Sequence, residues 1–354
     1  MNMDRKLKIG VIGVGSIAQC HITAYAANPH VELYALQDVN REFLEARGKE
    51  HGVQRLYTDL DEMLALPELD AVSVCTWNCA HASCAIAALE AGKHVLCEKP
   101  MALNADDALR MKQAADKAKK LLMIGFVRRY SDDTAAMKRF AEAGAFGDVY
   151  YAKASYLRRN GAPGGWFGDK TRSGGGPLID LGVHVIDLVR YVMGNPQPVS
   201  VYASTFYQLP KHPPLYAGKA YTAAVTSGKD VFNVEDLATA MIRFDNGATL
   251  AVDTSFNLHI REDRNIVEIF GTKGGARLAP ELEIYGEANG YLTNTTLDQK
   301  LTDFSGMFQN EIDHFVDCLL TGAPCRSPAE DGLALMRILD AAYESARTGD
   351  VVRI

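Results

Sequence analysis

The chain has 354 residues, of which 47% are hydrophobic and 23% are charged, so its composition is that of an ordinary globular protein. This length exceeds what one hydrophobic core usually serves, which predicts two domains. The net charge of −7 is spread along the chain and argues against nucleic acid as a partner. The apolar run Ile9 to Val14 is too short for a signal peptide or a membrane span, so we expect a cytoplasmic protein without a membrane partner.

From the N-terminus to about residue 125, short apolar runs alternate with helical stretches, which is typical of a parallel sheet wound by crossover helices. Strands are expected at Leu7–Ile12, Val31–Gln37, Ala71–Thr76, His94–Cys97 and Leu121–Ile124. Helices are expected at Ile17–Ala27, Arg41–His51, Cys79–Ala91 and Ala105–Lys120, with Asn104 placed to cap the last one. Residues 1–125 are therefore predicted to form a doubly wound α/β domain.

The pattern changes after Arg128, and residues 126–354 are predicted to form a second, α+β domain. Helices are expected at Asp132–Ala143, Phe308–Leu320 and Ala329–Ala346. Strands are expected at Val149–Leu157, Val199–Phe206, Asp236–Phe244, Ala248–Phe256 and Asn265–Phe270. Turn signals at 245–247 and 271–275 indicate hairpins, so these strands predict a large, mostly antiparallel open sheet. The late helices are candidates to pack back on the first domain, and the stretch from Gln208 to Asn233 is expected to be a long loop of undetermined role.

The seven cysteines stand singly along the chain. Cys75, Cys79, Cys84 and Cys97 lack the paired C-x₂-C spacing of a zinc site or a redox pair. We interpret them as reduced thiols that mostly fill the core, and no metal site is predicted.

A glycine-rich turn follows the first expected strand and opens a helix, the context in which G-x-G-x-x-G/A indicates dinucleotide binding. Gly13 permits the tight turn, Gly15 lets the backbone approach a pyrophosphate, and the small Ala18 lets helix and strand pack closely. Asp38 ends the second strand, where a carboxylate accepts hydrogen bonds from the adenosine ribose and repels a 2′-phosphate. NAD is therefore favoured, and Arg41 nearby leaves NADP possible.

Three polar clusters follow predicted strands or precede a predicted helix, where a doubly wound sheet places its active crevice. The first runs from Thr76 to His81, the second is Glu98-Lys99-Pro100, and the third runs from Gly174 to Asp187 in the second domain.

The motifs Gly13-x-Gly15-x-x-Ala18, Glu98-Lys99-Pro100 and Asp180-x-Gly182-x-His184 together resemble the glucose-fructose oxidoreductase, inositol dehydrogenase and rhizopine-catabolism family. The resemblance covers essentially the whole chain and implies an N-terminal Rossmann domain and an NAD-dependent sugar or polyol dehydrogenase. Thr76-Trp77-Asn78 resembles the family's Thr-Pro-Asn with Trp77 in place of proline, and the segment from Gly125 to Tyr130 resembles its connection between domains. The expected cofactor-binding residues are Gly13, Gly15, Ser16, Ile17, Asp38, Thr76, Trp77, Asn78, His81, Glu98, Lys99 and Arg128.

Oxidation of an alcohol needs a base for the hydroxyl proton while the hydride leaves for the nicotinamide. His184 is predicted to accept the proton, and it lies four residues after Asp180, so on a helix both would project from one face. The Lys99 ammonium would stabilise developing alkoxide charge, although either Lys99 or His184 can take the proton. Asp180 is expected to bond a substrate hydroxyl or His184, while Arg128 and Trp166 are further expected substrate contacts.

Each residue also has a plain structural interpretation: His184 as a core histidine, Lys99 as a surface lysine and Asp180 as a helix cap. Two other functions stay open, namely redox-neutral, NAD-dependent glycoside cleavage and a non-catalytic sugar- or dinucleotide-sensing regulator. Net NADH formation separates the first from a simple dehydrogenase, and any turnover excludes the second. A homodimer or homotetramer is expected, because the exposed face of a large antiparallel sheet is commonly buried in a subunit interface.

Overall fold

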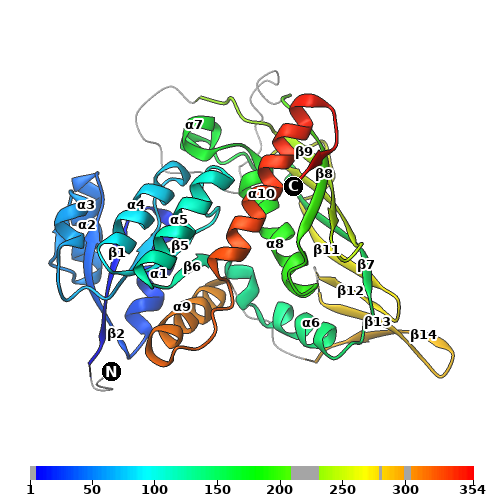
Figure 1. The fold of residues 1–354 in the computed structure, drawn as a ribbon, viewed down its shortest axis with the longest axis horizontal. Helices are drawn as coiled ribbons and strands as arrows, with labels where there is room; N and C mark the ends of the chain where they lie inside the picture. Colours follow the sequence, from blue (N-terminus) through cyan, green and yellow to red (C-terminus); the bar gives the residue numbers. More distant parts are fainter. Residues whose placement is uncertain (1–4, 209–230, 279–280, 299–303) are drawn as a thin grey trace. The chain divides into compact units, whose positions relative to one another are not determined.

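The computed structural model describes residues 5–208, 231–278, 281–298 and 304–354. Most of the expected loop from Gln208 to Asn233 lies outside these residues. The chain forms two compact units, one from Met1–Tyr130 with Asp303–Leu333 and the other from Ser131–Thr302 with Ala334–Ile354. Each unit therefore combines two separate stretches of the chain. Figure 1 shows the elements of both units.

The first unit contains a parallel sheet, and its described strands follow the order β3-β2-β1-β4-β5-β6. Its strands are β1 (Leu7–Ile12), β2 (Val31–Gln37), β3 (Leu56–Tyr57), β4 (Ala71–Val74), β5 (His94–Glu98) and β6 (Leu122–Gly125). This order is that of a dinucleotide-binding doubly wound sheet, with the topological switch between β1 and β4. The prediction of a doubly wound parallel sheet is confirmed.

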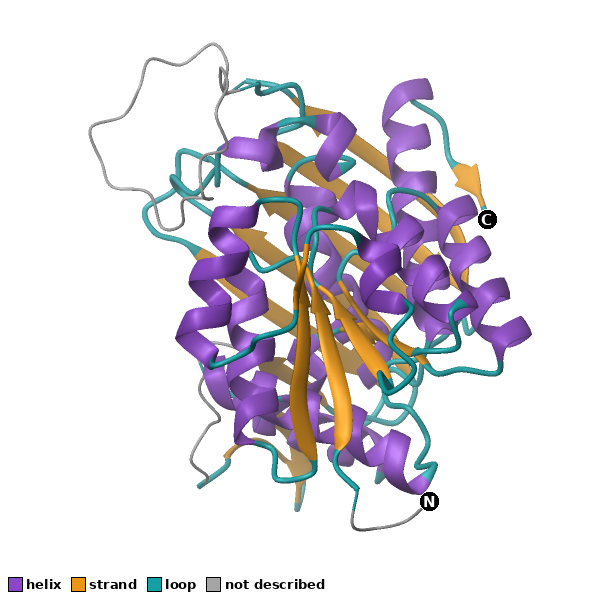
Figure 2. Cartoon of the chain, turned by 90° about the vertical axis from the view of Figure 1, so that its left-hand side faces the viewer, coloured by secondary structure: helices purple, strands orange, loops and turns teal. Residues whose placement is uncertain are grey.

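Helices lie on both sides of this sheet, as Figure 2 shows. They are α1 (Ser16–Ala27), α2 (Arg41–His51), α3 (Leu60–Leu64), α4 (Asn78–Glu90), α5 (Ala105–Ala118) and, late in the chain, α9 (Phe304–Thr321). A 3₁₀ turn, η1 (Val127–Tyr130), follows β6. The expected cap of α5 is present, because the Asn104 side chain accepts a hydrogen bond of 2.8 Å from the Asp107 backbone N–H.

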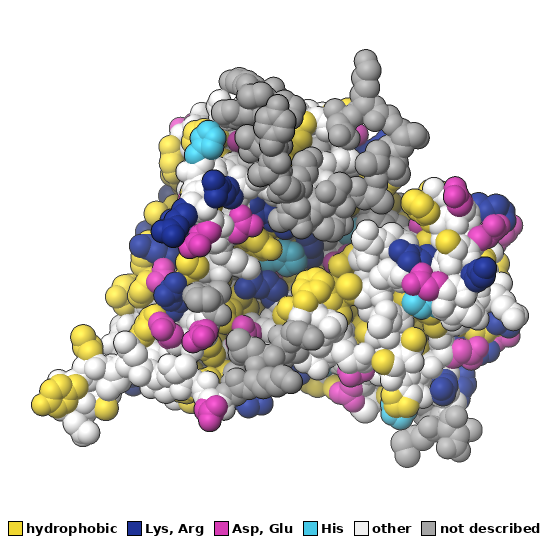
Figure 3. Space-filling view, turned by 180° about the vertical axis from the view of Figure 1, so that it is seen from behind, with side chains coloured by type: hydrophobic (Ala, Val, Ile, Leu, Met, Phe, Trp, Pro, Cys, Tyr) yellow, Lys and Arg dark blue, Asp and Glu magenta, His cyan; other side chains and the backbone are white. Residues whose placement is uncertain are grey.

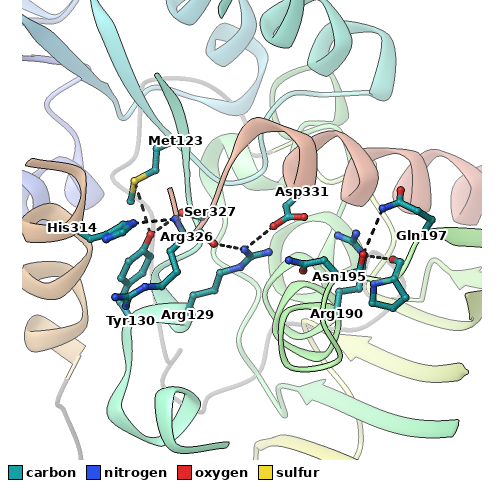
Figure 4. Close-up of polar contacts among 11 residues, drawn as sticks. Met123, Arg129, Tyr130, Arg190, Asn195, Gln197, His314, Arg326, Ser327 and Asp331 are labelled. Atoms are coloured by element: carbon teal, nitrogen blue, oxygen red, sulfur yellow. Dashed lines mark hydrogen bonds and ion pairs between the residues drawn. The ribbon is translucent and has the colours of Figure 1, made fainter. Parts of the chain in front are cut away.

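Helix α9 packs on α1 within the first unit, although nearly 280 residues separate them in the chain. Asn28 donates to the Asp313 carboxylate at 2.7 Å, and the Gln309 amide donates to the Ala24 carbonyl at 3.3 Å. The segment after α9 is held by the buried Arg129, whose guanidinium contacts the Asp331 carboxylate at 2.8 Å and the Arg326 carbonyl at 2.6 Å (Figure 4).

The second unit contains a mixed sheet, and its described strands follow the order β14-β13-β12-β11-β7-β10-β9-β8-β15. Its strands are β7 (Val149–Leu157), β8 (Pro198–Phe206), β9 (Leu237–Phe244), β10 (Thr249–Ser255), β11 (Arg264–Gly271), β12 (Gly275–Leu278), β13 (Glu283–Ala288), β14 (Tyr291–Thr296) and β15 (Val352–Arg353). Every neighbouring pair is antiparallel except β7 and β10. The prediction of a large, mostly antiparallel sheet is confirmed, and both predicted hairpin turns join consecutive strands.

One face of this sheet is buried against helix α8, and side chains on the other face are exposed as far as the structure describes the chain. Along β9 the inward side chains Ala240 and Ile242 are buried, whereas the intervening Met241 is 47% exposed. The helices of this unit are α6 (Asp132–Glu142), α7 (Lys170–Ser173), α8 (Val183–Val192) and most of α10 (Ala329–Thr348). Two short turns accompany them, a 3₁₀ turn η2 (Gly165–Gly168) and a π-helical turn η3 (Leu178–Gly182).

On the face drawn in Figure 3, Lys and Arg side chains are interspersed with Asp and Glu. In the ranges that the structure describes, no helix combines the length and the apolar character needed to cross a bilayer.

Candidate active site

The turn between β1 and α1 is built on two glycines that serve different purposes. Gly13 has φ +81°, and a Cβ there would lie 2.9 Å from the Cys75 carbonyl oxygen, so the fold itself requires glycine. Gly15 has an ordinary φ of −68°, and a Cβ there would meet nothing within 4 Å. The free space above Gly15 lies at the N-terminus of α1, where backbone N–H groups and the helix dipole favour a phosphate.

Asp38 is fixed beside this turn by two backbone hydrogen bonds. One carboxylate oxygen accepts from the Val14 N–H and the other from the Asn40 N–H, both at 2.8 Å. These bonds orient the carboxylate at the end of β2, next to the glycine turn. Arg41 is exposed and lies 3.7 Å from Glu45, one turn along α2. Asp38 and Arg41 thus both follow the carboxyl end of β2, with Arg41 as the first residue of α2.

His81 joins the first two polar clusters, which follow the adjacent strands β4 and β5. Its Nδ1 lies 2.8 Å from the Pro100 carbonyl and its Nε2 lies 3.1 Å from the Thr76 carbonyl. Burial lowers the pKa of His81, whereas the two carbonyls, which can only accept hydrogen bonds, oppose that shift. The structure therefore brings the Thr76 and Lys99 turns together and makes His81 the link between them.

Glu98 and Lys99 have opposite environments although they are neighbours. Lys99 is partly exposed, and the Lys99–Pro100 peptide is cis. Glu98 is buried, accepts a hydrogen bond from the His21 ring at 2.8 Å, and accepts another from the Lys99 backbone N–H at 3.1 Å. Glu98 thus holds the backbone of Lys99 from inside the protein.

Asp180 and His184 lie in the second unit, in different kinds of helix. Asp180 is buried in the π-helical turn η3, and His184 is partly exposed in the first turn of α8. The expectation that one α-helix carries both is therefore wrong, because the turn widens before α8 begins. The interpretation of Asp180 as a helix cap is also wrong, since it sits within η3. Such π turns occur often at functional sites.

The turn that carries Asp180 is fixed by a buried carboxylate from elsewhere in the chain. Glu235 accepts hydrogen bonds from the Leu178 N–H at 3.2 Å, from the Gly176 N–H, and from the Tyr343 hydroxyl at 2.9 Å. Burial raises the pKa of Glu235 in spite of these bonds. A Cβ on Gly176 would lie 1.9 Å from the Glu235 carbonyl, so the approach depends on glycine.

The remaining predicted residues lie near these groups in the chain. Ser16 begins α1 and is exposed, whereas Ile17 is half-buried; Trp77 precedes α4, and Asn78 is its buried first residue. Arg128 is partly exposed in η1, beside the buried Arg129.

Trp166 lies in the second unit, in the short turn η2. Its ring stacks on Phe167 with 4.0 Å between the ring centroids. This aromatic pair precedes the Gly174 to Asp187 segment in the chain.

Residues 7–126 match the family described as "Oxidoreductase family, NAD-binding Rossmann fold", and residues 134–277 match the "GFO/IDH/MocA C-terminal domain". The chain belongs to this family. It is therefore an NAD-dependent oxidoreductase, and the resemblance seen in the motifs is confirmed.

Several members of the family are similar to this oxidoreductase over nearly its full length. D-glucoside 3-dehydrogenase of Escherichia coli is 33% identical over 98% of this chain and 97% of that protein. Myo-inositol 2-dehydrogenase of Thermotoga maritima is 30% identical over 96% of each chain. A structure of levoglucosan dehydrogenase in complex with NADH and levoglucosan superposes with a TM-score of 0.85 at 27% identity, covering 99% of this chain and 100% of that one.

Four residues that contact or neighbour the predicted motifs were not predicted: the buried His21 and Glu311 in the first unit, and the buried Glu235 and half-buried Tyr343 in the second. Glu311 had a signal in the sequence, because it stands on the apolar stripe of α9 with Phe308, Ile312 and Phe315 at helical spacing. An acid on such a stripe is buried and needs an explanation. Glu235 had no comparable signal, because its partners come from distant segments.

Proposed function

We propose that this NAD-dependent oxidoreductase oxidises a secondary alcohol of a sugar or a cyclic polyol to the ketone. The observation that carries the proposal is the full-length similarity to relatives named glucoside and inositol dehydrogenases, together with a glycine turn that leaves room for a pyrophosphate. An inositol, an aldose or an anhydro-sugar each offers the secondary alcohol that the reaction needs. NAD, when bound, supplies the hydride acceptor.

The cofactor half of the site is assigned to the first unit. Gly15, Ser16 and Ile17 would bind the pyrophosphate at the start of α1, and the Asp38 carboxylate would accept hydrogen bonds from the adenosine ribose. The carboxylate is already oriented by two backbone bonds, so binding costs it little conformational entropy. The further cofactor contacts are Gly13, Thr76, Trp77, Asn78, His81, Glu98, Lys99 and Arg128.

The reacting half of the site is assigned to Lys99, Asp180 and His184. The His184 imidazole would take the hydroxyl proton, because histidine titrates near neutral pH. The Lys99 ammonium would hydrogen-bond the same oxygen and stabilise the negative charge that develops as the hydride leaves. Asp180 would hold a neighbouring hydroxyl or His184. Arg128 and Trp166 would complete the substrate contacts, the indole against the C–H face of the sugar.

The first test measures NADH formation by absorbance against a panel of inositols, aldoses and anhydro-sugars, with NAD and NADP in parallel. Lys99→Ala and His184→Ala should each lower kcat by about 10²–10⁴-fold, the usual worth of a positioned proton-transfer or charge-stabilising group. Lys117→Ala, an exposed lysine on α5, is the matched control and should keep full activity. Substrate consumption without NADH would contradict net oxidation and point to redox-neutral glycoside cleavage.

A further inference from the structure

Three buried polar side chains meet under the Lys99 turn, inside the first unit. They are His21 of α1, Glu98 of β5 and Glu311 of α9, and each offers an atom within 4.8 Å of the atoms offered by the others. All three are at most 5% exposed. The mechanism proposed above uses only Glu98, so the presence of a second carboxylate needs a physical reason.

Glu98 ends a chain of hydrogen bonds that links α1 to the neighbouring strands β4 and β5. The Tyr25 hydroxyl lies 2.7 Å from the Ser73 hydroxyl, which lies 3.1 Å from His21 Nδ1, and His21 Nε2 lies 2.8 Å from Glu98. One assignment of protons satisfies every member: Tyr25 donates to Ser73, Ser73 to His21, and His21 to an ionised Glu98. In this assignment His21 is neutral, and the other Glu98 oxygen accepts from the Lys99 N–H.

Glu311 differs from Glu98 in its hydrogen bonding. Within the described residues neither of its carboxyl oxygens has a hydrogen-bond partner, although the side chain is fully buried. The titratable groups that face it are His21 and Tyr25 of α1, Cys75 after β4, Glu98 of β5 and Tyr130 of η1. Lys99 adds a positive charge on the side of Glu98.

Two adjacent carboxylates in such a site cannot both ionise at reasonable cost. Burial, and next the charge of Glu98, raise the pKa of Glu311 well above its usual range. Burial alone would also raise the pKa of Glu98, but its hydrogen bond to His21 and the positive charge of Lys99 hold it below its usual range. The two carboxyl groups are therefore driven to opposite protonation states.

A metal ion shared by the three groups fits the geometry less well. Ligand bonds of about 2.0–2.2 Å place tetrahedral ligand atoms roughly 3.4 Å apart. The Nε2 atom of His21 and the Oε1 atom of Glu98 are only 2.8 Å apart, which is the separation of a hydrogen bond. This separation fits a proton between the two atoms better than a cation.

We propose that Glu311 is a neutral carboxylic acid packed beside Glu98, and that this pair positions Lys99 for the reaction. Glu311 is thus a positioning residue, since it acts on Lys99 through Glu98. The part of this inference that concerns the reaction rests on the proposed function, whereas the protonation state of Glu311 does not.

The test compares the full-length wild-type protein with Glu311→Gln, which keeps the shape and a donor, and with Glu311→Leu, which keeps neither polar atom. Asp317→Asn, an exposed acid on the same helix, is the matched control. Infrared spectroscopy at neutral pH should show the band of a protonated carboxylic acid in the wild type and the control, and this band should be weaker in Glu311→Gln. An undiminished band in Glu311→Gln would overturn the proposal.

The pH dependence of thermal unfolding gives a second readout that needs no substrate. A carboxyl whose pKa is higher in the folded than in the unfolded protein stabilises the fold at low pH. This stabilisation is lost as the pH rises from the pKa of the unfolded state toward that of the folded state. The Tm of Glu311→Gln relative to the wild type should therefore increase between about pH 4.5 and alkaline pH, while Asp317→Asn shows no such trend. A difference in Tm that does not change with pH would contradict a neutral Glu311.

Kinetics test the positioning role. Glu311→Leu should lower kcat tenfold or more with the KM for NAD within about twofold, because a small misplacement of Lys99 is costly. Glu311→Gln, unlike Glu311→Leu, should keep kcat within about twofold of the wild type. Equal kcat in all variants would overturn the positioning role. One equivalent of Zn²⁺ or Mn²⁺ bound by the wild type and not by Glu311→Gln would instead assign the cluster to a cation.

Discussion

We expect cofactor choice to depend most directly on Asp38. Its carboxylate would repel a 2′-phosphate, and its orientation is fixed by the Val14 and Asn40 N–H groups. Replacement by asparagine keeps an acceptor for one N–H and removes the charge. Asp38→Asn should therefore raise the ratio of kcat/KM for NADP to that for NAD at least about tenfold, equivalent to roughly 1.4 kcal/mol.

The control for Asp38→Asn is Glu32→Gln, which removes an exposed acidic charge from the opposite end of the same strand. It should leave the cofactor ratio unchanged. A ratio that does not move in Asp38→Asn would mean that Asp38 does not contact the ribose.

Arg129 and Asp331 form a buried ion pair in the first unit. The Arg129 side chain is fully buried and that of Asp331 is 10% exposed. Asp331→Ala removes a charged partner of the buried guanidinium, and we expect a loss of about 3–5 kcal/mol in the free energy of unfolding. Chemical denaturation measures this loss, and Asp116→Ala, an exposed acid on α5, should cost far less. A small loss for both variants would contradict the importance of this pair.

At the scale of elements, the β1–α1 turn contains two glycines for which we expect different roles. Gly13 is needed for folding, and Gly15 is expected to be needed for cofactor binding. Gly13→Ala should cost about 1–3 kcal/mol of stability, because φ is positive and the Cys75 carbonyl is in the way. Gly15→Ala should leave the Tm unchanged or raise it slightly, since its backbone suits alanine and the space is free. The same variant should weaken NAD binding at least about tenfold.

Calorimetry with NAD and thermal unfolding without it check the two glycine variants. Loss of both stability and NAD binding in Gly15→Ala would contradict the assignment of this space to the pyrophosphate.

Local pattern was enough to predict most elements of the first unit and most of the central strands of the second. Each of those strands is buried on one or both faces, so its apolar periodicity stands out. β3 and β15 have two residues each, too few to show a period, and β14 (Tyr291–Thr296) is polar and mostly exposed. These elements are defined by pairing with a neighbour, which local pattern does not reveal.

In the candidate site, too, local motifs were predictable and long-range contacts were not. The motifs around Gly13, Lys99 and Asp180 were visible because their spacing is local. The buried partners that hold them, Glu235 and Glu311, come from segments far away in the chain, and so does His21 with respect to Glu98. The π turn at Asp180 also escaped prediction, because its extra residue leaves no mark in the hydrophobic pattern.

At the scale of the whole molecule, we propose that the open face of the second sheet mediates a homodimer or homotetramer. Tyr202 and Met241 are paired neighbours on this face and are 49% and 47% exposed. Further along the same face Tyr151 stacks on Phe270. Apolar and aromatic side chains gathered on an exposed sheet are typical of an interface.

The double variant Tyr202→Asp with Met241→Asp tests this assembly, because charges directly across a subunit contact oppose it. Light scattering after gel filtration should show a smaller oligomer than for the wild type. The control replaces Tyr291 and Leu292, exposed residues of β14, with serine. An unchanged mass for the Asp variant would place the interface elsewhere.

The central claim is that a hydride passes from a sugar or polyol carbon to NAD, and isotopic labelling tests it most directly. The substrate that gives NADH is prepared with deuterium on the carbon that bears the oxidised alcohol, and the nicotinamide product is analysed by mass spectrometry. The account predicts one deuterium in each NADH formed, with the rate lost in Lys99→Ala and His184→Ala. NADH without deuterium, or labelled substrate consumed without any NADH, would contradict it.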